Sequence, residues 1–370
     1  MKYTKYIILF LLLGCIEPIE FEIPPAESLL IIEGMINDED GPYTVQISRA
    51  VPLSVDTLEV PPVSGASVRL HDDLGNVEDF DETEPGIYQT RGAIKGEVGR
   101  SYHITVSVDG KSYESTPEEI KPVGQISEIR YEFKEERIED LFGEKNKDHF
   151  NIYVDAEQGD ETGGYVRWRM TGTYKVETTP QLRETLHHPG AVPLKAPRPC
   201  SGYTTAVHPS GRGTIIVKVG ECTCCECYVD MKESVPQVSD NLLVSEGSYN
   251  NVKIGRVPVN SATFMEKYMV RVEQMSLSRT AFDFFKLINI QKEQASNIFQ
   301  PSSGELLGNI KALNSQDRVL GLFWATSITE KVTFIERDDV PYPVPDFPGA
   351  NESCLLEFDY STTEPPEEWN

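Results

Sequence analysis

Six cysteines in the second half of this 370-residue chain are the residues best suited to covalent or metal-binding chemistry. Four form a Cys-x-Cys-Cys-x-Cys cluster at residues 222–227, and one cysteine lies on each side of it. The six are Cys200, Cys222, Cys224, Cys225, Cys227 and Cys354. An even number in an exported protein favours disulfides. Because only two cysteines lie outside the cluster, complete oxidation requires at least one disulfide within it.

A straight β-strand is a poor frame for that disulfide. Neighbouring Cα atoms lie about 3.8 Å apart and those two residues apart about 6.5 Å, whereas a disulfide joins Cα atoms about 4.4–6.8 Å apart. On a straight strand, Cys222 and Cys224 would face one side, and Cys225 and Cys227 the other. We therefore expect a bend or bulge in the cluster, or two cysteines that stay unpaired.

The alternative for this cluster is a metal site. Its spacing resembles that of metallothionein-like clusters, in which thiolates bind soft or borderline ions. Structural zinc sites use gaps of typically two to four residues, which only non-neighbouring members of the cluster meet. Since an oxidising compartment favours disulfides, we expect disulfides rather than a metal at Cys222, Cys224, Cys225 and Cys227, and no bound cofactor.

The other chemistry-bearing residues form no known catalytic motif. The histidines are His71, His103, His149, His187, His188 and His208, and none belongs to a His-Glu-x-x-His sequence. Neither a Gly-x-Ser-x-Gly motif nor a phosphate-binding loop is present. Asp72-Asp73 and Asp338-Asp339 lie outside any EF-hand loop, so solvated turns explain them better than calcium binding. We expect a protein that is not an enzyme.

The N-terminus has the pattern of a secretory signal. A basic start precedes an apolar run at residues 6–13, which is too short to span a bilayer, since that takes about 20 residues. The sequence Leu12-Leu13-Gly14-Cys15 resembles the lipobox of bacterial lipoproteins. We therefore expect removal of residues 1–14 and lipidation of Cys15, which would anchor the chain to a membrane. An ordinary signal peptide with an incidental cysteine is the alternative.

The composition is that of a folded, strongly acidic protein. With 34 Lys+Arg against 59 Asp+Glu, the formal net charge is −25, which argues against nucleic-acid binding. Hydrophobic residues make up 39% of the chain and charged residues 25%, which is typical of globular proteins. Residues 15–27 are rich in acidic residues and are expected to form a tether after the lipidated cysteine.

The elements that must position these residues are mostly strands. Residues 28–122 contain alternating runs at 43–48, 66–70 and 102–108, separated by turn residues, which predicts a β-sandwich domain. Asp109-Gly110 predicts a tight hairpin.

Residues 123–370 predict a second β-rich domain with one amphipathic helix. Strand patterns recur there, and a long irregular loop is expected at 178–213. Helical spacing over about 278–296, with Ser278 as the N-cap, predicts the helix.

Several segments together resemble one known family. They are the lipobox, LIIEG at 30–34, GPYTV at 41–45, PVSGASV at 62–68, PGIY at 85–88, GRSY at 99–102, SLSRTAFDFF at 276–285, GNI at 308–310 and VLGLF at 319–323. This combination resembles the lipoprotein family known as domain of unknown function 4249. The first half is also similar to carboxypeptidase-regulatory-like and other immunoglobulin-like sandwiches. The cysteine cluster departs from the family pattern.

The resemblance implies a location and a partner but no catalytic residues. Members are lipoproteins of the Gram-negative outer membrane, often found beside TonB-dependent receptors. It therefore implies an accessory or ligand-binding subunit of such a receptor or of another outer-membrane β-barrel. The acidic tether is similar to the export signal of surface-exposed lipoproteins, which implies the cell surface; a solvated linker is the alternative. A surface adhesin or scaffold, and a metal-binding protein that uses the cysteine cluster, are the alternatives.

Overall fold

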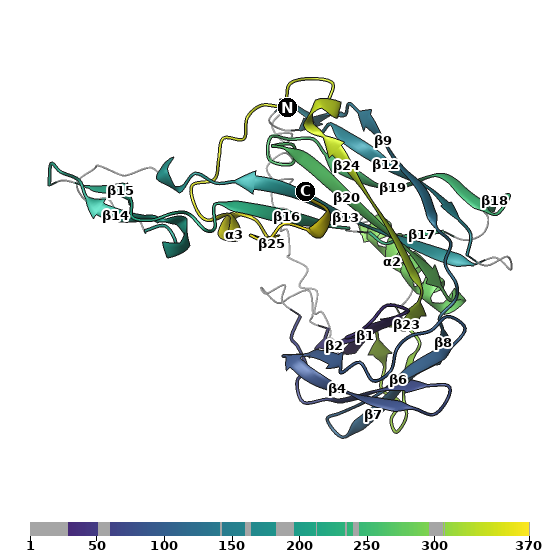
Figure 1. Ribbon diagram of the computed structural model, residues 1–370. Coiled ribbons are helices and arrows are strands. Elements are labelled where there is room, and N and C mark those ends of the chain that lie inside the picture. The colour runs from purple at the N-terminus through teal and green to yellow at the C-terminus, as the bar shows by residue number, and fades with distance from the viewer. Residues whose placement is uncertain are drawn as a thin grey trace, which may run out of the picture.

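The computed structural model describes residues 29–50, 60–140, 143–159, 164–182, 196–211, 213–233, 235–239, 244–295, 306 and 308–369. The fold is mostly β, as the sequence predicts. Two β-modules meet beside one long helix, and a two-stranded ribbon projects away from them (Figure 1). The signal peptide expected at 1–14, the expected lipidation site Cys15 and the expected tether at 15–27 lie outside the described residues.

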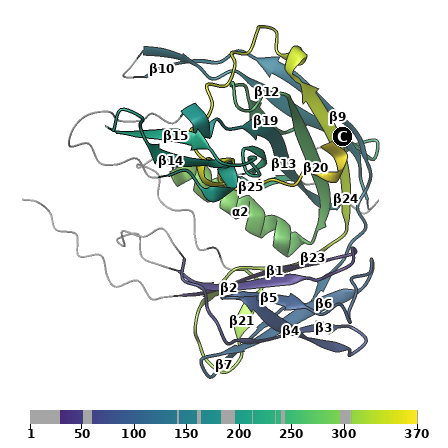
Figure 2. The same cartoon turned by 60° about the vertical axis from the view of Figure 1, so that its left-hand side comes forward.

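The N-terminal module is a β-sandwich (Figure 2). Its strands are β1 (Leu30–Asn37), β2 (Thr44–Arg49), β3 (Ser67–Asp72), β4 (Val77–Glu84), β5 (Ile87–Thr90), β6 (Ser101–Val108), β7 (Lys111–Ser115), β8 (Glu118–Glu119), β21 (Ile310–Ala312), β22 (Val319–Leu320) and β23 (Phe323–Thr326). The order is β21-β7-β6-β3-β4-β5-β2-β1-β22, with β8 beside β6 and β23 beside β1. Strand β4 pairs first with β3 and then with β5, so it links the two layers.

Alternation places the apolar side chains of this module inside. On β3, Val68 and Leu70 are buried, whereas the intervening Arg69 is exposed. The hairpin predicted at Asp109-Gly110 is confirmed: both residues have positive φ angles, of 52° and 72°, and they join β6 to β7.

The N-terminal module also uses strands from the other end of the chain. Strand β21 pairs with β7, while β22 and β23 run parallel to β1. The expected boundaries, 28–122 for the first domain and 123–370 for the second, are therefore wrong for residues 310–326. A parallel partner can come from far along the chain, so short-range sequence patterns do not identify it.

The second module packs a four-stranded sheet against a six-stranded one (Figure 1). The smaller sheet has the order β18 (Val244–Ser245), β19 (Ser248–Pro258), β12 (His149–Glu157) and β9 (Ile126–Lys134). The larger has β24 (Ile328–Glu336), β20 (Lys267–Leu277), β13 (Tyr165–Glu177), β16 (Glu226–Lys232) and β25 (Ser361–Thr362), with β17 (Gln237–Ser239) beside β13. A separate pair consists of β10 (Arg137–Asp140) and β11 (Gly143–Asn146).

The core between these sheets contains a polar group whose hydrogen bonds are satisfied. Gln274 has no exposed surface, and its Oε1 accepts a 2.8 Å hydrogen bond from the Trp168 indole. Its Nε2 donates to the carbonyls of Gly124 and Glu157, at 3.1 and 3.0 Å. Because a buried amide without partners is costly, this network favours one alignment of β20 with the neighbouring loop.

Helix α2 (Arg279–Ala295) lies where the two modules meet (Figure 2). The sequence predicts it over about 278–296, and Ser278 is the N-cap, since its Oγ accepts a 3.1 Å hydrogen bond from the Ala281 amide. Phe282 stacks on Tyr165 of β13 with ring centroids 4.5 Å apart, and Phe285 packs against Trp324 of β23. The aromatic face of the helix therefore joins the modules.

A short helix and several helical turns complete the described part. These are η1 (Pro180–Leu182), η2 (Pro199–Ser201), η4 (Arg337–Asp339), α3 (Cys354–Glu357) and η5 (Glu367–Trp369). No helix among the described residues combines the length and the apolar character needed to cross a membrane.

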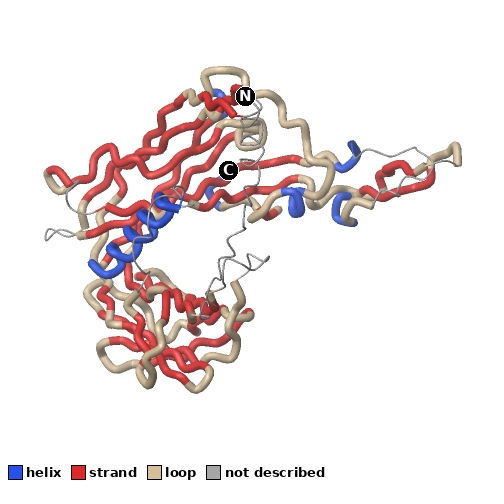
Figure 3. The backbone as a smooth tube through the Cα atoms, turned by 180° about the vertical axis from the view of Figure 1, so that it is seen from behind, coloured by secondary structure: helices blue, strands red, loops and turns tan. Residues whose placement is uncertain are grey.

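The irregular loop expected at 178–213 contains a strand. Strand β14 (Tyr203–Val207) pairs with β15 (Thr214–Lys218) to form a separate two-stranded sheet. The ribbon extends away from both modules in views from the front and from behind (Figures 1 and 3).

Candidate functional site

We name the described residues between 196 and 225 the arm. Its outer part is the β14–β15 ribbon, and its root is the surrounding 196–202 and 219–225 segments, which carry four of the six cysteines. No described strand pairs with either edge of the ribbon. A two-stranded hairpin without a supporting sheet is marginally stable in water, so the root must hold it in place.

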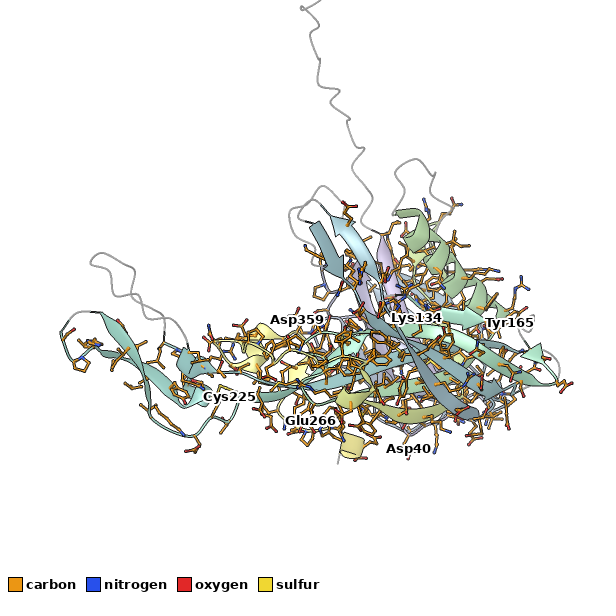
Figure 4. The ribbon with its side chains drawn as sticks, turned by 90° about the horizontal axis from the view of Figure 1, so that it is seen from above. Asp40, Lys134, Tyr165, Cys225, Glu266 and Asp359 are labelled. Carbon is orange, nitrogen blue, oxygen red and sulfur yellow. A yellow bond between two sulfur atoms is a disulfide. The ribbon has the colours of Figure 1, made fainter. Side chains whose placement is uncertain are left out.

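Two disulfides lie within the root, and a third lies beside it in the body. Cys200 bonds to Cys224, Cys222 to Cys225, and Cys227 of β16 to Cys354 of α3, with Cα–Cα distances of 5.6, 5.8 and 5.9 Å. One pair lies within the cluster, as complete oxidation requires. Residues 223–225 form a bend, which is the geometry expected for a disulfide between residues so close in sequence. Cys225 lies where the arm leaves the body (Figure 4).

Backbone hydrogen bonds reinforce the disulfides. The Thr223 amide donates to the Cys200 carbonyl at 2.8 Å, and the Cys354 amide donates to the Cys224 carbonyl at 3.1 Å. Gly202 has a φ of 70°, and a Cβ there would collide with the Gly220 carbonyl, so glycine is required at this close crossing. The backbone segments of the root therefore pack closely against one another.

Three of these cysteines are far more buried than the ribbon. Cys224, Cys227 and Cys354 are at most 1% exposed. No residue of β14 or β15 is buried, and Val207 is 73% exposed. The disulfides therefore anchor a ribbon whose β-branched side chains contact solvent.

The hydrogen-bond register shows which backbone groups face outward. The Val219 amide donates to the Gly202 carbonyl and the His208 amide to the Gly213 carbonyl, at 2.7 and 3.1 Å. In an antiparallel pair, hydrogen-bonded and non-bonded residue pairs alternate. The backbone groups of Thr205 on β14, and of Thr214 and Ile216 on β15, therefore point away from the ribbon.

Such an edge is suited to binding another strand. Outward amides and carbonyls form a template for strand addition, in which main-chain hydrogen bonds give affinity and side chains give specificity. The arm is therefore the candidate binding surface of this protein. The sequence pattern indicated the root cysteines and a strand at 214–219, which is β15, but it did not indicate β14, which lies in the expected irregular loop. The β-branched runs at 203–207 and 214–218, on either side of a Pro- and Gly-containing turn, were the available signal.

The metal alternative has no free thiolates in this state. All four cluster cysteines are bonded in disulfides, so metal binding there would require reduction. Among the described residues, no group of three or more His, Cys, Asp or Glu side chains has an arrangement suited to a metal ion.

The structure places the described histidines in separate parts of the molecule. His71 and His103 stack on the outer face of the N-terminal module with ring centroids 4.6 Å apart, and burial lowers the pKa of His71. His149 begins β12, and His208 lies at the tip of the arm, where its Nδ1 is 2.7 Å from the Ser210 hydroxyl. His187 and His188 lie outside the described residues.

Both acidic pairs organise turns. The Asp72 carboxylate accepts hydrogen bonds from the backbone amides of Leu74 and Asn76, at 3.0 and 2.8 Å. Asp339 accepts from the Glu336 amide at 2.9 Å and from the Tyr131 hydroxyl at 2.8 Å. Burial, together with that contact, raises the pKa of Tyr131 to about 12. These contacts agree with the interpretation as turns.

A shallow cavity of about 480 Å³ lies on the four-stranded sheet, lined by residues that include Arg130, Tyr153 and Asn251. The Arg130 guanidinium lies 2.8 Å from the Asp155 carboxylate, so its charge is compensated within the protein. The arm therefore has the stronger claim to a binding role.

The fold and the arm define a two-module β-protein with a disulfide-braced projection. The chain belongs to the family described as Domain of unknown function (DUF4249), which matches residues 16–332. A comparison with curated proteins finds no match. Among solved structures, the chain is similar to the crystal structure of a DUF4785 family protein from Legionella pneumophila subsp. pneumophila str. Philadelphia 1, with 6% identity and a TM-score of 0.18. That similarity covers 67% of this chain and 52% of that one.

Proposed function

We propose that this protein is a non-enzymatic, lipid-anchored accessory or ligand-binding subunit of the outer membrane. Its partner would be a TonB-dependent receptor or another outer-membrane β-barrel. The observation that carries the proposal is the arm, which presents open strand edges from a braced root. A projection of this kind is suited to contact with another molecule, because burial of its exposed β-branched side chains would stabilise the complex.

Two features of the sequence support the location. The lipobox resemblance at Cys15 supports a lipid anchor, and the acidic residues that follow support surface exposure. Replacing Cys15 with Ser should release the protein from the membrane fraction, because the acyl chains provide the attachment. A Cys15→Ser variant that stays in the membrane pellet after a high-salt wash would contradict the lipid anchor.

Co-purification tests the partner. The native protein is extracted from membranes in mild detergent and isolated with its bound proteins. We expect a β-barrel to accompany the full chain and to be absent when a short Gly-Ser turn replaces residues 203–218. Mass spectrometry showing all three disulfides is the folding control for that variant. A full chain that migrates without any barrel would contradict the proposal.

The projecting arm also fits a second candidate, a surface adhesin or scaffold. A deletion strain separates the two functions. Impaired nutrient uptake with normal attachment supports the accessory subunit, whereas impaired attachment with normal uptake supports the adhesin.

A further inference from the structure

The arm differs in charge from the rest of the protein. The chain has 59 acidic residues, yet none lies between residues 185 and 220. The same stretch has four basic residues, of which Arg198 and Lys218 belong to the arm. A basic stretch of this length in a protein of net charge −25 is a marked charge segregation.

Acidic residues reappear where the arm meets the body. Glu221 lies at the root, with its carboxylate 3.2 Å from the Lys218 ammonium, and both side chains are exposed. Solvent screens this ion pair, so it is weak. Glu352 accepts a 3.1 Å hydrogen bond from the Arg198 amide, which places a carboxylate beside the other basic residue. The ribbon beyond these contacts has no acidic side chain.

We propose that the arm binds an acidic β-strand at a sheet edge of a partner protein, by adding that strand to β14 or β15. The proposal deepens the binding role assigned above and names the chemistry of the partner. An acidic partner would be repelled by the body and attracted to the arm. The projection separates these two regions, so the arm gives both affinity and orientation (Figure 4).

The backbone and the side chains favour a protein strand over a lipid surface. Outward amides and carbonyls, such as those of Thr205 and Thr214, are matched by another strand, whereas lipid acyl chains offer them no partner. Apolar side chains also occur on both faces of the ribbon. Val207 and Ile216 share one face, and Ile215 and Val217 share the other. A ribbon lying on a membrane would need one apolar face and one polar face.

Proline substitutions test the edges without breaking the ribbon. The amides of Thr205 and Thr214 point outward, so Thr205→Pro or Thr214→Pro removes a donor from one edge but no hydrogen bond between β14 and β15. Thr204→Pro is the matched disruptive control, because the Thr204 amide faces β15. All variants are made in the full chain, and mass spectrometry must show the three disulfides intact.

Charge reversal tests the electrostatic part. The double variant Arg198→Glu, Lys218→Glu is compared with Lys147→Glu, which reverses an exposed lysine between β11 and β12. We expect about tenfold weaker association for the double variant and no change for the control. Raising NaCl from about 0.1 M to 1 M shortens the Debye length from about 10 Å to 3 Å, and it should weaken association of the unmodified chain.

The readout is photocross-linking in the producing bacterium from a photoreactive residue at Val207, which is 73% exposed. We expect cross-links to an acidic β-strand, lost in one of the two edge-proline variants and in the double charge variant. Cross-links to a segment without acidic residues, or cross-links unchanged in every variant, would overturn the proposal. So would binding of the Cys15→Ser chain to phosphatidylglycerol vesicles that depends on Arg198 and Lys218 but not on the edge prolines.

The outcomes distinguish this inference from the proposed function. An acidic strand on a protein that is not a β-barrel would support the arm chemistry and contradict the barrel partner. A barrel that co-purifies equally with all variants would support the partner and contradict the role of the arm.

Discussion

Glu118 is a carboxyl group that the fold holds in a buried place. Its side chain is 4% exposed, and its Oε1 accepts a 3.2 Å hydrogen bond from the Asn309 amide group. Burial disfavours the charged form and raises the pKa of Glu118 above its usual range. The stability of the contact between β8 and the segment that leads into β21, where Asn309 lies, therefore depends on pH.

Replacing Glu118 with Gln should change how stability depends on pH. Because the pKa of Glu118 is higher in the folded state, its contribution to stability is complete below its unfolded pKa and is lost as the pH rises through the folded pKa. Each unit of raised pKa corresponds to about 1.4 kcal/mol. The neutral amide has no such loss, so Glu118→Gln should gain stability over the native chain as pH rises from 4 toward 7. Urea unfolding across that range measures this difference, and parallel curves would contradict the prediction.

Gly202 tests the close crossing at the root of the arm. Its φ of 70° disfavours any other residue, and a Cβ would collide with the Gly220 carbonyl. Gly202→Ala should therefore destabilise the root by about 1–3 kcal/mol. Gly220→Ala is the control, since an added Cβ there meets no atom within 4 Å. Protease sensitivity of the arm compares the two variants, and equal sensitivity would refute this account.

At the scale of elements, the disulfides decide whether the ribbon keeps its position. Cys200–Cys224 closes a loop with a sequence separation of 24, whereas Cys222–Cys225 has a separation of 3. In the chain-entropy account, the longer loop contributes about 3.5 kcal/mol and the shorter about half as much.

Removing one disulfide at a time should separate these effects. The double variant Cys200→Ser, Cys224→Ser should lose hydrogen-exchange protection in β14 and β15, while the body keeps its own. The variant Cys222→Ser, Cys225→Ser should lose less protection in the ribbon. An arm that stays equally protected in both variants would show that backbone hydrogen bonds alone hold the root.

At the scale of the whole molecule, the two modules are interleaved in sequence. Phe323 of β23 is 1% exposed, and it belongs to the core of the N-terminal module although it is distant from β1 along the chain. Two serines fix the crossing between the modules. The hydroxyls of Ser276 and Ser327 both donate to the Lys121 carbonyl, at 2.6 and 2.5 Å.

Phe323→Ala should therefore destabilise β1 and β2, which lie near the other end of the sequence. Removing a buried phenylalanine typically costs about 3–5 kcal/mol. We expect faster hydrogen exchange in β1 and β2 in this variant. Leu313→Ala is the control, since Leu313 is 58% exposed and its loss should change little. If exchange accelerates only in the second module, β23 does not support the N-terminal core as described.

The sequence by itself determined the local features of this protein. Period-two alternation gave the β character, Asp109-Gly110 gave a hairpin, and Ser278 gave the start of α2, because each depends on residues close together in the chain. Counting cysteines required one disulfide within the cluster, since only two partners lie outside it. The stretch without acidic residues at 185–220, which contains the ribbon, is likewise a property of the sequence alone.

Only the tertiary structure decided which distant segments meet. The pairing of β1 with β22 and β23, the bond of Cys227 to Cys354, and the projection of the ribbon follow from packing across long stretches of chain. Such contacts depend on the total burial of apolar surface and on matching backbone hydrogen bonds, which no short window of residues contains. For the same reason the edge that we propose for binding became visible only once β14 and β15 were aligned.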